Sequence, residues 1–301
     1  MRVLDSHLHL WDPSRLSYSW LEGPLLARFA AEEAIVARGA GSTTDAGSHA
    51  AVFVQADCAP EQYLDEVDWV SSIAEEAGVR GIVAGARLDE RGSVEHHLDA
   101  LRARPLVVGV RHLLQSEPAG FARTDAFVAG ARALAARDLS FDACVRGVEQ
   151  LGDVAALASA VPDLRIVLDH LGKPEIGTAD APRGPEQAWI TAISAVAAHP
   201  QVACKLSGLP AEAGGSWSAA QVQPFFDVAL SVFGPDRLMI GSDWPVSAVT
   251  AAGWAGESGT PIDADAVPAW TDAVAGWARS RGIDVDDVLW RNAERFYPLS
   301  A

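Results

Sequence analysis

The sequence predicts an α/β fold in which eight parallel strands and their helices close into a single barrel, regular or distorted. Eight short runs rich in Val, Ile, Leu and Phe recur along the 301 residues, and Ala-rich segments with helical spacing separate most of them. No linker or change of composition divides the chain. Because alternating strands and helices form parallel sheets, and eight such units close a barrel, we expect one domain over residues 1–301.

The strands are expected where apolar runs end at turn residues or at polar side chains. They are Val3 to His9, Ala51 to Asp57, Gly81 to Leu88, Leu106 to Leu114, Ser140 to Val145, Arg165 to His170, Val202 to Ser207 and Leu238 to Asp243. Between the second and third runs, Leu64, Val67, Val70 and Ala74 recur on one helical face. An open doubly wound sheet is the alternative, but it would more often show five to seven strands and a Gly-rich nucleotide loop. No GxGxxG pattern follows any of these runs.

Two stretches are longer than plain connections. Residues 11–50 follow the first strand and include Trp20 and a Gly/Ser/Thr-rich patch over 39–48, and residues 244–268 follow the eighth strand and begin at Trp244. Loops that follow strands lie at the active face of a barrel, so both are candidate lids or substrate walls. For the Gly/Ser/Thr-rich patch, a simple surface loop is an equally good interpretation.

The charge balance limits the partners of the protein. It has 23 Lys and Arg against 40 Asp and Glu, a net charge of -17, which repels nucleic acid and anionic membrane surfaces. No leader pattern follows Met1 and no run of 18 apolar residues occurs. The three cysteines form no CxxC pair and are expected as buried thiols, which suits a reducing cytoplasm. The oligomeric state, a homo-oligomer included, stays open.

Chemically useful side chains collect at the predicted strand ends. His7 and His9 are two residues apart on the first strand, so their rings point to the same side, and His112 and His170 end later strands. Asp243 closes the apolar eighth strand, where a charge is expensive unless it is paired, hydrated or bound to a cation. Catalytic groups of β/α barrels lie on this face, so the sequence predicts an active site there.

Several separated motifs resemble the amidohydrolase superfamily, whose members are TIM barrels, and within it the branch of sugar-lactone hydrolases. They are His7-Leu-His9, Leu168-Asp-His-Leu-Gly-Lys-Pro174 and Gly241-Ser-Asp-Trp-Pro245, together with Gly109-Val-Arg-His-Leu-Leu-Gln115, Cys204-Lys-Leu-Ser-Gly208 and Asn292-Ala-Glu-Arg-Phe-Tyr297. This branch includes L-fuconolactonase, L-rhamnonolactonase and pyrone-dicarboxylate lactonase. The likeness covers essentially the whole chain.

The resemblance implies that Asp243 is the general base for the hydrolytic water. His7, His9 and His170 would then polarise the lactone carbonyl or hold a metal ion that does so. Ester opening needs a deprotonated water, positive charge or donors where the oxyanion develops, and a proton for the departing ring oxygen. This residue set can meet those needs.

A two-metal site is not expected. Binuclear members of the superfamily have a bridging Lys or Glu on strand four and a histidine on strand five, whereas these strands offer Arg111 and His112, and Asp142 and Cys144. His7, His9 and Asp243, with His170 as a fourth, would suit one divalent ion such as Zn²⁺. Because some relatives work without a metal, metal-dependent and metal-independent catalysis both stay open.

Further side chains near the predicted barrel mouth are candidates for binding substrate. Gln55, Arg87, His112 and Lys205 lie near strand ends, although each could equally fill a barrel layer. Trp20 and Trp244 offer flat apolar faces for a sugar ring. Few arginines lie near strand ends, which favours a neutral aldonolactone over a dicarboxylate.

The sequence therefore predicts a carboxylic ester hydrolase that opens a small lactone, such as L-fucono- or L-rhamnonolactone, in sugar acid catabolism. Three alternatives are a metal-dependent amidohydrolase or decarboxylase, a pyrone-dicarboxylate-type lactonase, and a sugar-binding protein without activity. The last fits least, because a binder needs no buried base.

Overall fold

The computed structural model of the protein describes residues 1–39, 49–257 and 260–299. Its strands form one eight-stranded parallel sheet in the order β1 to β8, which confirms the predicted barrel. The strands are β1 Val3–Leu8, β2 His49–Val54, β3 Val79–Gly85, β4 Val107–Arg111, β5 Ser140–Ala143, β6 Ile166–Leu168, β7 Val202–Leu206 and β8 Leu238–Ile240. Each of the eight predicted runs overlaps one observed strand, and no observed end differs from the predicted one by more than three residues.

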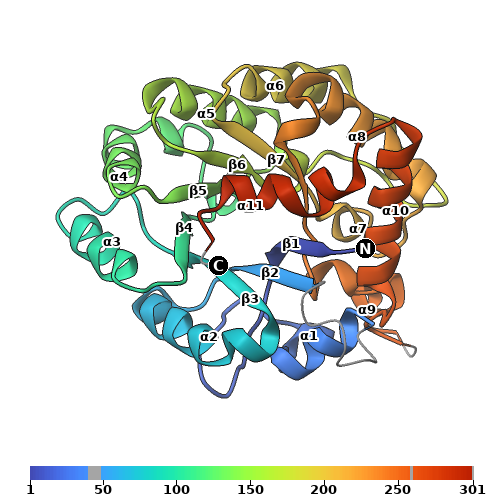
Figure 1. Ribbon diagram of the computed structural model, residues 1–301, viewed down its shortest axis with the longest axis horizontal. Helices are drawn as coiled ribbons and strands as arrows, with labels where there is room; N and C mark the ends of the chain where they lie inside the picture. The colour runs from blue at the N-terminus through green and yellow to red at the C-terminus, as the bar shows by residue number, and fades with distance from the viewer. Residues whose placement is uncertain (40–48, 258–259, 300–301) are drawn as a thin grey trace.

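Helices surround the strands on the outside of the barrel (Figure 1). They are α1 Ala31–Ala37, α2 Tyr63–Ala77, α3 Val94–Arg102, α4 Asp125–Ala135, α5 Gly147–Ala160, α6 Gln187–Ala197, α7 Leu209–Glu212, α8 Ala219–Phe233, α9 Ala251–Ala255, α10 Ala266–Ser280 and α11 Asn292–Phe296, with the π-helical turn η8 Asp287–Arg291 before the last. The predicted apolar face of α2 is buried at Val67, Val70 and Ala74. Burial of that face holds the helix on the sheet.

The barrel closes where the turn after β8 meets β1. The Asp243 amide donates to the His7 carbonyl at 2.8 Å, and the His9 amide donates to the Trp244 carbonyl at 2.9 Å. The Asp5 carboxylate accepts from both the amide and the hydroxyl of Ser242, at 2.8 and 2.6 Å. Main-chain and side-chain bonds therefore fix the two ends of the sheet to each other.

The opposite end of the barrel is covered by the C-terminal elements. Trp290, Ala293 and Tyr297 pack against apolar side chains from several strands inside the barrel. Figure 1 shows α11, in red, crossing in front of the strands. Inward-facing Val83 and Val108 belong to the same cluster. This packing seals the barrel, so the strand ends after β1, β6 and β8 form its open mouth.

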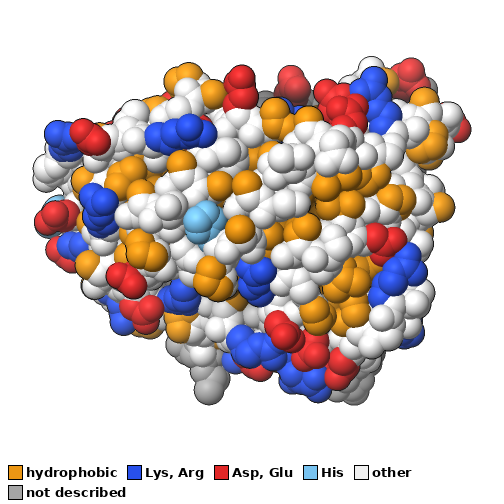
Figure 2. Space-filling model, turned by 90° about the horizontal axis from the view of Figure 1, so that it is seen from above, with side chains coloured by type: hydrophobic (Ala, Val, Ile, Leu, Met, Phe, Trp, Pro, Cys, Tyr) orange, Lys and Arg blue, Asp and Glu red, His pale blue; other side chains and the backbone are white. Residues whose placement is uncertain are grey.

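Charged side chains of both signs lie on the face of the molecule shown in Figure 2. On the face shown in Figure 2, basic and acidic side chains lie beside one another, with apolar side chains scattered between them. Within the part of the chain that the structure describes, no helix is long and apolar enough to cross a membrane. The three cysteines are free and buried, as the sequence predicts.

Glu66 on α2 has a carboxylate that is fully buried. Its Oε1 accepts from the Ala56 amide at 3.0 Å, while Oε2 has no hydrogen-bond partner among the described residues. Burial raises the pKa of Glu66 to about 7. The folded protein therefore binds this proton more tightly than the unfolded chain does, so stability is full at low pH and declines as pH rises toward 7.

We expect Glu66→Gln to remove this decline. Between about pH 4 and pH 8 the unfolding free energy of the wild type should fall by about 3 kcal/mol, whereas that of the variant should not. This figure is the rise in the Glu66 pKa from 4.5 to about 7, converted at about 1.36 kcal/mol per pKa unit. Urea unfolding of both proteins at several pH values measures it. The exposed Glu75 of the same helix supplies the control, Glu75→Gln, which should follow the wild type. Equal pH slopes for Glu66→Gln and wild type would contradict the expectation.

Candidate active site

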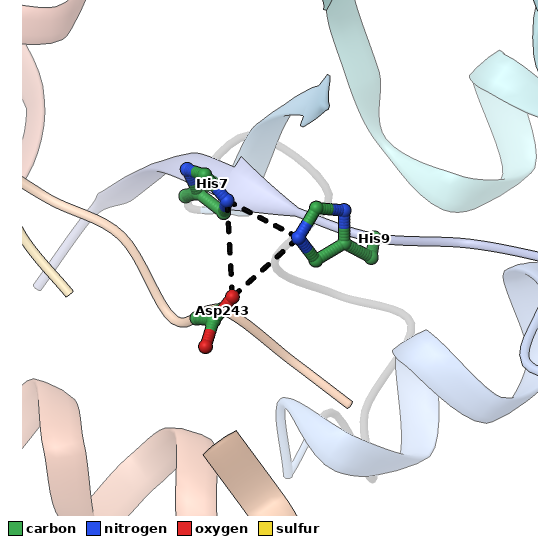
Figure 3. Close-up of side chains that lie close together, drawn as sticks. All are labelled: His7, His9 and Asp243. Carbon is green, nitrogen blue, oxygen red and sulfur yellow. Dashed lines mark hydrogen bonds and ion pairs between the residues drawn. The ribbon is translucent and has the colours of Figure 1, made fainter. Parts of the chain in front are cut away.

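The side chains expected to form the site come from three strand ends and meet at the barrel mouth. His7 lies on β1, His9 directly follows it, His170 follows β6 and Asp243 follows β8. Figure 3 shows His7 and His9 from one strand facing the Asp243 carboxylate. The pairing of β1 with β2 is irregular between Asp5 and Leu8, which lets two neighbouring imidazoles converge.

One carboxylate oxygen is shared by three imidazoles. Asp243 Oδ1 lies 3.4 Å from His9 Nε2, 3.7 Å from His170 Nε2 and 3.8 Å from His7 Nε2. The two Nε2 atoms of His7 and His9 are 3.1 Å apart. The structure thus brings together all four residues for which the sequence predicts a catalytic role.

Hydrogen bonds behind the site orient two of these side chains. The Ser247 hydroxyl donates to Asp243 Oδ2 at 2.7 Å, which leaves Oδ1 turned toward the imidazoles. Ser207 Oγ lies 2.9 Å from His170 Nδ1. Both His170 and Asp243 have left-handed backbone, with φ of 53° and 55°. Such strain in residues with a Cβ concentrates at functional sites.

The protonation states suit a base among neutral rings. Although burial opposes ionisation, the imidazoles of His170, His9 and His7 hold the pKa of Asp243 well below its usual range. Burial lowers the pKa of His170 to about 3 and, with the Lys205 ammonium, holds that of His7 well below its usual value. Near neutral pH the site therefore contains an ionised Asp243 and uncharged imidazoles at His7 and His170.

The cluster also fits a divalent metal ion. His7, His9 and Asp243 each offer one ligand atom, all within 4.8 Å of one another and all buried. Tetrahedral Zn²⁺ with ligand bonds of about 2.0–2.1 Å separates its ligand atoms by about 3.3 Å, close to the 3.1 to 3.8 Å found here. Imidazole nitrogen with carboxylate oxygen is a donor set that suits zinc.

A pocket of about 340 Å³ opens above the cluster. This volume suits a small molecule. Its walls combine polar groups with the aromatic faces of Trp20 and Trp254. It is lined by His9, Trp20, Ala56, Asp57, Arg111, Leu113, Gln115, Ser116, Cys144, Arg146, His170, Lys173, Gly208, Ala211, Glu212, Asp243, Val246 and Trp254.

Both extended loops contribute to the pocket. Trp20, from the loop after β1, lines it and donates from its indole nitrogen to the Ala56 carbonyl at 2.7 Å. Val246 and Trp254, from the segment after β8, form another part of the wall. Most of the predicted Gly/Ser/Thr-rich patch, residues 40–48, lies outside the described residues.

The other predicted substrate-binding residues lie apart from the pocket walls. The Gln55 side chain accepts a hydrogen bond from the Asp57 amide, and Arg87 forms ion pairs with Asp89 and Glu117. His112 forms hydrogen bonds with the Leu88 amide and the Glu117 carboxylate. Lys205 is buried among Asp142, Asp169 and His7, and the Trp244 ring packs on Phe29. Their role in binding substrate stays a prediction, whereas Trp20 reaches the pocket as expected.

Several lining residues were not singled out from the sequence as substrate-binding. Arg111 at the end of β4 is buried, donates to the Gln55 carbonyl and keeps an Nε that has no partner among the described residues. Arg146 forms a bidentate ion pair with Glu212, at 2.7 and 2.9 Å, and Lys173 lies 3.8 Å from the same carboxylate. Lys173 belongs to the motif around His170, which could have revealed it.

The sequence of the chain matches that of a known family along nearly its whole length. A model of the amidohydrolase family covers residues 4–299. The protein belongs to this amidohydrolase family. This match confirms the resemblance to the amidohydrolase superfamily that the sequence motifs predicted.

The amidohydrolase-family relatives include proteins named for lactone hydrolysis. A protein of Burkholderia multivorans named L-fucono-1,5-lactonase is 31% identical over 265 residues, which cover 83% of this chain and 84% of the relative. Another L-fucono-1,5-lactonase, from Burkholderia ambifaria, is 46% identical over 115 residues, 38% of each chain. A solved amidohydrolase structure from Burkholderia multivorans, with bound zinc, is 29% identical and covers 100% of both chains at a TM-score of 0.76.

Gly208 leaves the space that the His170 ring occupies. Its φ is +71°, and a Cβ at this position would lie 2.3 Å from His170 Nδ1. We expect Gly208→Ala to displace the ring and to lower kcat by about 10- to 100-fold in a folded protein, because misplaced catalytic groups are costly. Steady-state kinetics with circular dichroism measures both.

A matched variant separates displacement of the ring from backbone strain. Gly214 has a similar φ of +61°, but a Cβ there would have nothing within 4 Å. Gly214→Ala should therefore lose stability without a comparable loss of kcat. If both variants lose the same activity, contact with His170 is not the cause.

Proposed function

We propose that this amidohydrolase-family member is a lactonase, a carboxylic ester hydrolase that opens a small sugar lactone. The observation that carries the proposal is the shared Asp243 oxygen, within 4 Å of three imidazole Nε2 atoms at the base of a pocket. Similarity to proteins named L-fucono-1,5-lactonase supports the choice of reaction. An ionised carboxylate among neutral donors is the arrangement that water-mediated ester opening requires.

In the proposed reaction, Asp243 Oδ1 accepts a proton from water as the water oxygen attacks the lactone carbonyl. The carbonyl oxygen becomes an oxyanion, to which an imidazole N–H donates. His170 suits this task, because Ser207 can donate to its Nδ1 and leave the proton on Nε2, which faces Asp243 and the pocket. When the intermediate collapses, the bond to the ring oxygen breaks and Asp243 returns its proton to that oxygen.

His7, His9 and Asp243 would hold a divalent ion, and the zinc in the solved structure of the similar Burkholderia multivorans amidohydrolase supports this proposal. Bound there, such an ion would polarise the carbonyl and acidify the water. The protein's own groups position the Asp243 carboxylate and keep the rings of His7 and His170 uncharged.

A neutral polyhydroxylated aldonolactone fits the pocket walls best. Arg146 and Lys173 both lie beside Glu212, so much of their charge is balanced within the protein. Trp20 and Trp254 offer apolar faces to a sugar ring. Arg111 also lines the pocket and carries N–H donors for a substrate oxygen. L-fucono- and L-rhamnonolactone are the proposed substrates.

We expect Asp243→Asn to lower kcat by about 10³-fold or more while the fold is retained, because the amide keeps the shape of the side chain but cannot accept the proton. Release of acid from L-fuconolactone, followed with a pH indicator, measures the rate. Asp57→Asn, which changes another carboxylate of the pocket wall, is the control and should retain most of kcat. A near-normal rate for Asp243→Asn would show that another group is the base.

A panel of lactones tests the substrate class. Neutral aldonolactones should be opened with a kcat/KM at least about tenfold above that for a lactone carrying two carboxylates. The reason is that Arg146 and Lys173 of the pocket wall already lie beside Glu212, so they stabilise the carboxylates of a substrate only weakly. The same assay with a chelator shows whether a metal ion is needed. Preference for the dicarboxylate would contradict the proposed substrate, and turnover of amides alone would contradict lactonase activity.

A further inference from the structure

A buried cluster of charges lies on the side of His7 that faces away from the pocket. Lys205 Nζ is 2.5 Å from Asp142 Oδ2 and 3.0 Å from Asp169 Oδ1, and none of these three side chains is exposed. We call Asp142, Asp169 and Lys205 the interior triad. The Tyr297 hydroxyl donates to Asp142 Oδ2 at 2.8 Å, so the C-terminal region also contacts the triad.

Stability does not account for the interior triad. Side-chain layers inside a β/α barrel are dominated by Val, Ile and Leu, and apolar residues of similar volume often replace a buried ion cluster without loss of stability. The interior triad instead contacts the candidate active site through one atom, His7 Nδ1. His7 Nδ1 lies 3.1 Å from Lys205 Nζ and 3.2 Å from Asp169 Oδ1.

Proton positions in the metal-free site follow from hydrogen-bond geometry. His9 Nδ1 lies 2.8 Å from the Val54 carbonyl oxygen, which can only accept, so the His9 proton is on Nδ1. In the neutral form of this ring, Nε2 is then a lone pair that faces His7 Nε2 at 3.1 Å. With no ion between them, two facing lone pairs repel each other, so in that state the His7 proton lies on Nε2 and is donated to His9.

His7 Nδ1 is then an acceptor, and its two neighbours differ in what they can offer. The Lys205 ammonium has only protons to donate, whereas the Asp169 carboxylate can only accept. A neutral imidazole has one proton to place, on Nδ1 or on Nε2. Lys205 supports the tautomer with the proton on Nε2.

A metal ion requires the opposite tautomer. If His7 and His9 bind an ion through their Nε2 atoms, the His7 proton must move to Nδ1, where Asp169 Oδ1 at 3.2 Å accepts it. Lys205 would then donate only to the two carboxylates. His7 Nδ1 therefore has two opposing neighbours: Lys205 favours the metal-free state, and Asp169 favours the ion-bound state.

We propose that Lys205 is a positioning residue that holds His7 in the Nε2-protonated tautomer and so weakens capture of a divalent ion, while Asp169 supports the Nδ1-protonated, ion-binding tautomer. The proposal rests on the proposed function for the place of His7 in the active site. It gives the interior triad a role in setting the metal dependence of the enzyme, through His7 and without contact with substrate.

The tautomer is measured first in the wild-type protein without metal. Long-range ¹H–¹⁵N spectra of protein labelled in the histidine ring nitrogens distinguish the two tautomers, and His7→Gln assigns the signals. We expect the His7 proton on Nε2. A proton on Nδ1 in the metal-free protein would overturn the proposal, and this measurement needs no variant of the triad.

Zinc affinity is then compared by competition with a chromophoric chelator. The double variant Lys205→Met with Asp142→Asn removes one charge of each sign, so the net buried charge is kept. It should bind Zn²⁺ about tenfold more tightly and show His7 protonated on Nδ1. Asp169→Asn should bind Zn²⁺ about 10- to 100-fold more weakly, the usual effect of losing a carboxylate that supports a metal-binding histidine.

Opposite changes in the two proteins support the proposal, because general damage to the barrel would weaken both. Changes in the same direction, or no change in either, overturn it. Glu212→Gln, which removes a pocket carboxylate that pairs with Arg146, is the control and should bind Zn²⁺ like the wild type. Zinc binding and the spectra need no lactone, so absence of lactone turnover would contradict the proposed function alone.

Discussion

The bond between the turn after β8 and strand β1 is the constraint on which the site depends. The Asp243 amide donates to the carbonyl of His7, so the residue expected to act as base is joined through its own backbone to one of the imidazoles that it faces. The Asp5 carboxylate, which binds Ser242 twice, secures the same contact from the other side. The bonds that close the sheet therefore also place Asp243 beside the imidazoles.

Charge is distributed unevenly inside the barrel. The mouth holds the ionised Asp243 carboxylate beside the neutral rings of His7 and His170, while the interior below it holds an ammonium with two carboxylates. In a low-dielectric interior such groups interact strongly, and each unsatisfied one is expensive. The imidazole of His7 stands between the two regions and contacts both.

Sequence patterns predicted the barrel and the meeting of His7, His9, His170 and Asp243, because strand periodicity and strand order determine which residues share a barrel mouth. How deep in the barrel a strand side chain lies was harder to predict. Lys205 precedes the end of β7 by one residue, and a rise of about 3.3 Å per residue is enough to bury its head among carboxylates below the pocket.

Loop residues were the least predictable part of the site. Trp244 was expected at the mouth, but its backbone carbonyl bonds to the His9 amide and its ring turns onto Phe29. Arg146 and Glu212 follow different strands and meet only through the folded loops. Periodicity carries no information about such paths, so these wall residues emerge only from the structure.

The closure between Asp5 and Ser242 also bears on how the protein is made. These residues are 237 positions apart, so at about 5–20 residues per second a ribosome needs on the order of 10 to 50 seconds to produce the second after the first. Throughout that interval the nascent chain contains His7 and His9 but not Asp243. Asp243 can therefore join the imidazoles of His7 and His9 only late in synthesis, after the eighth strand has been made.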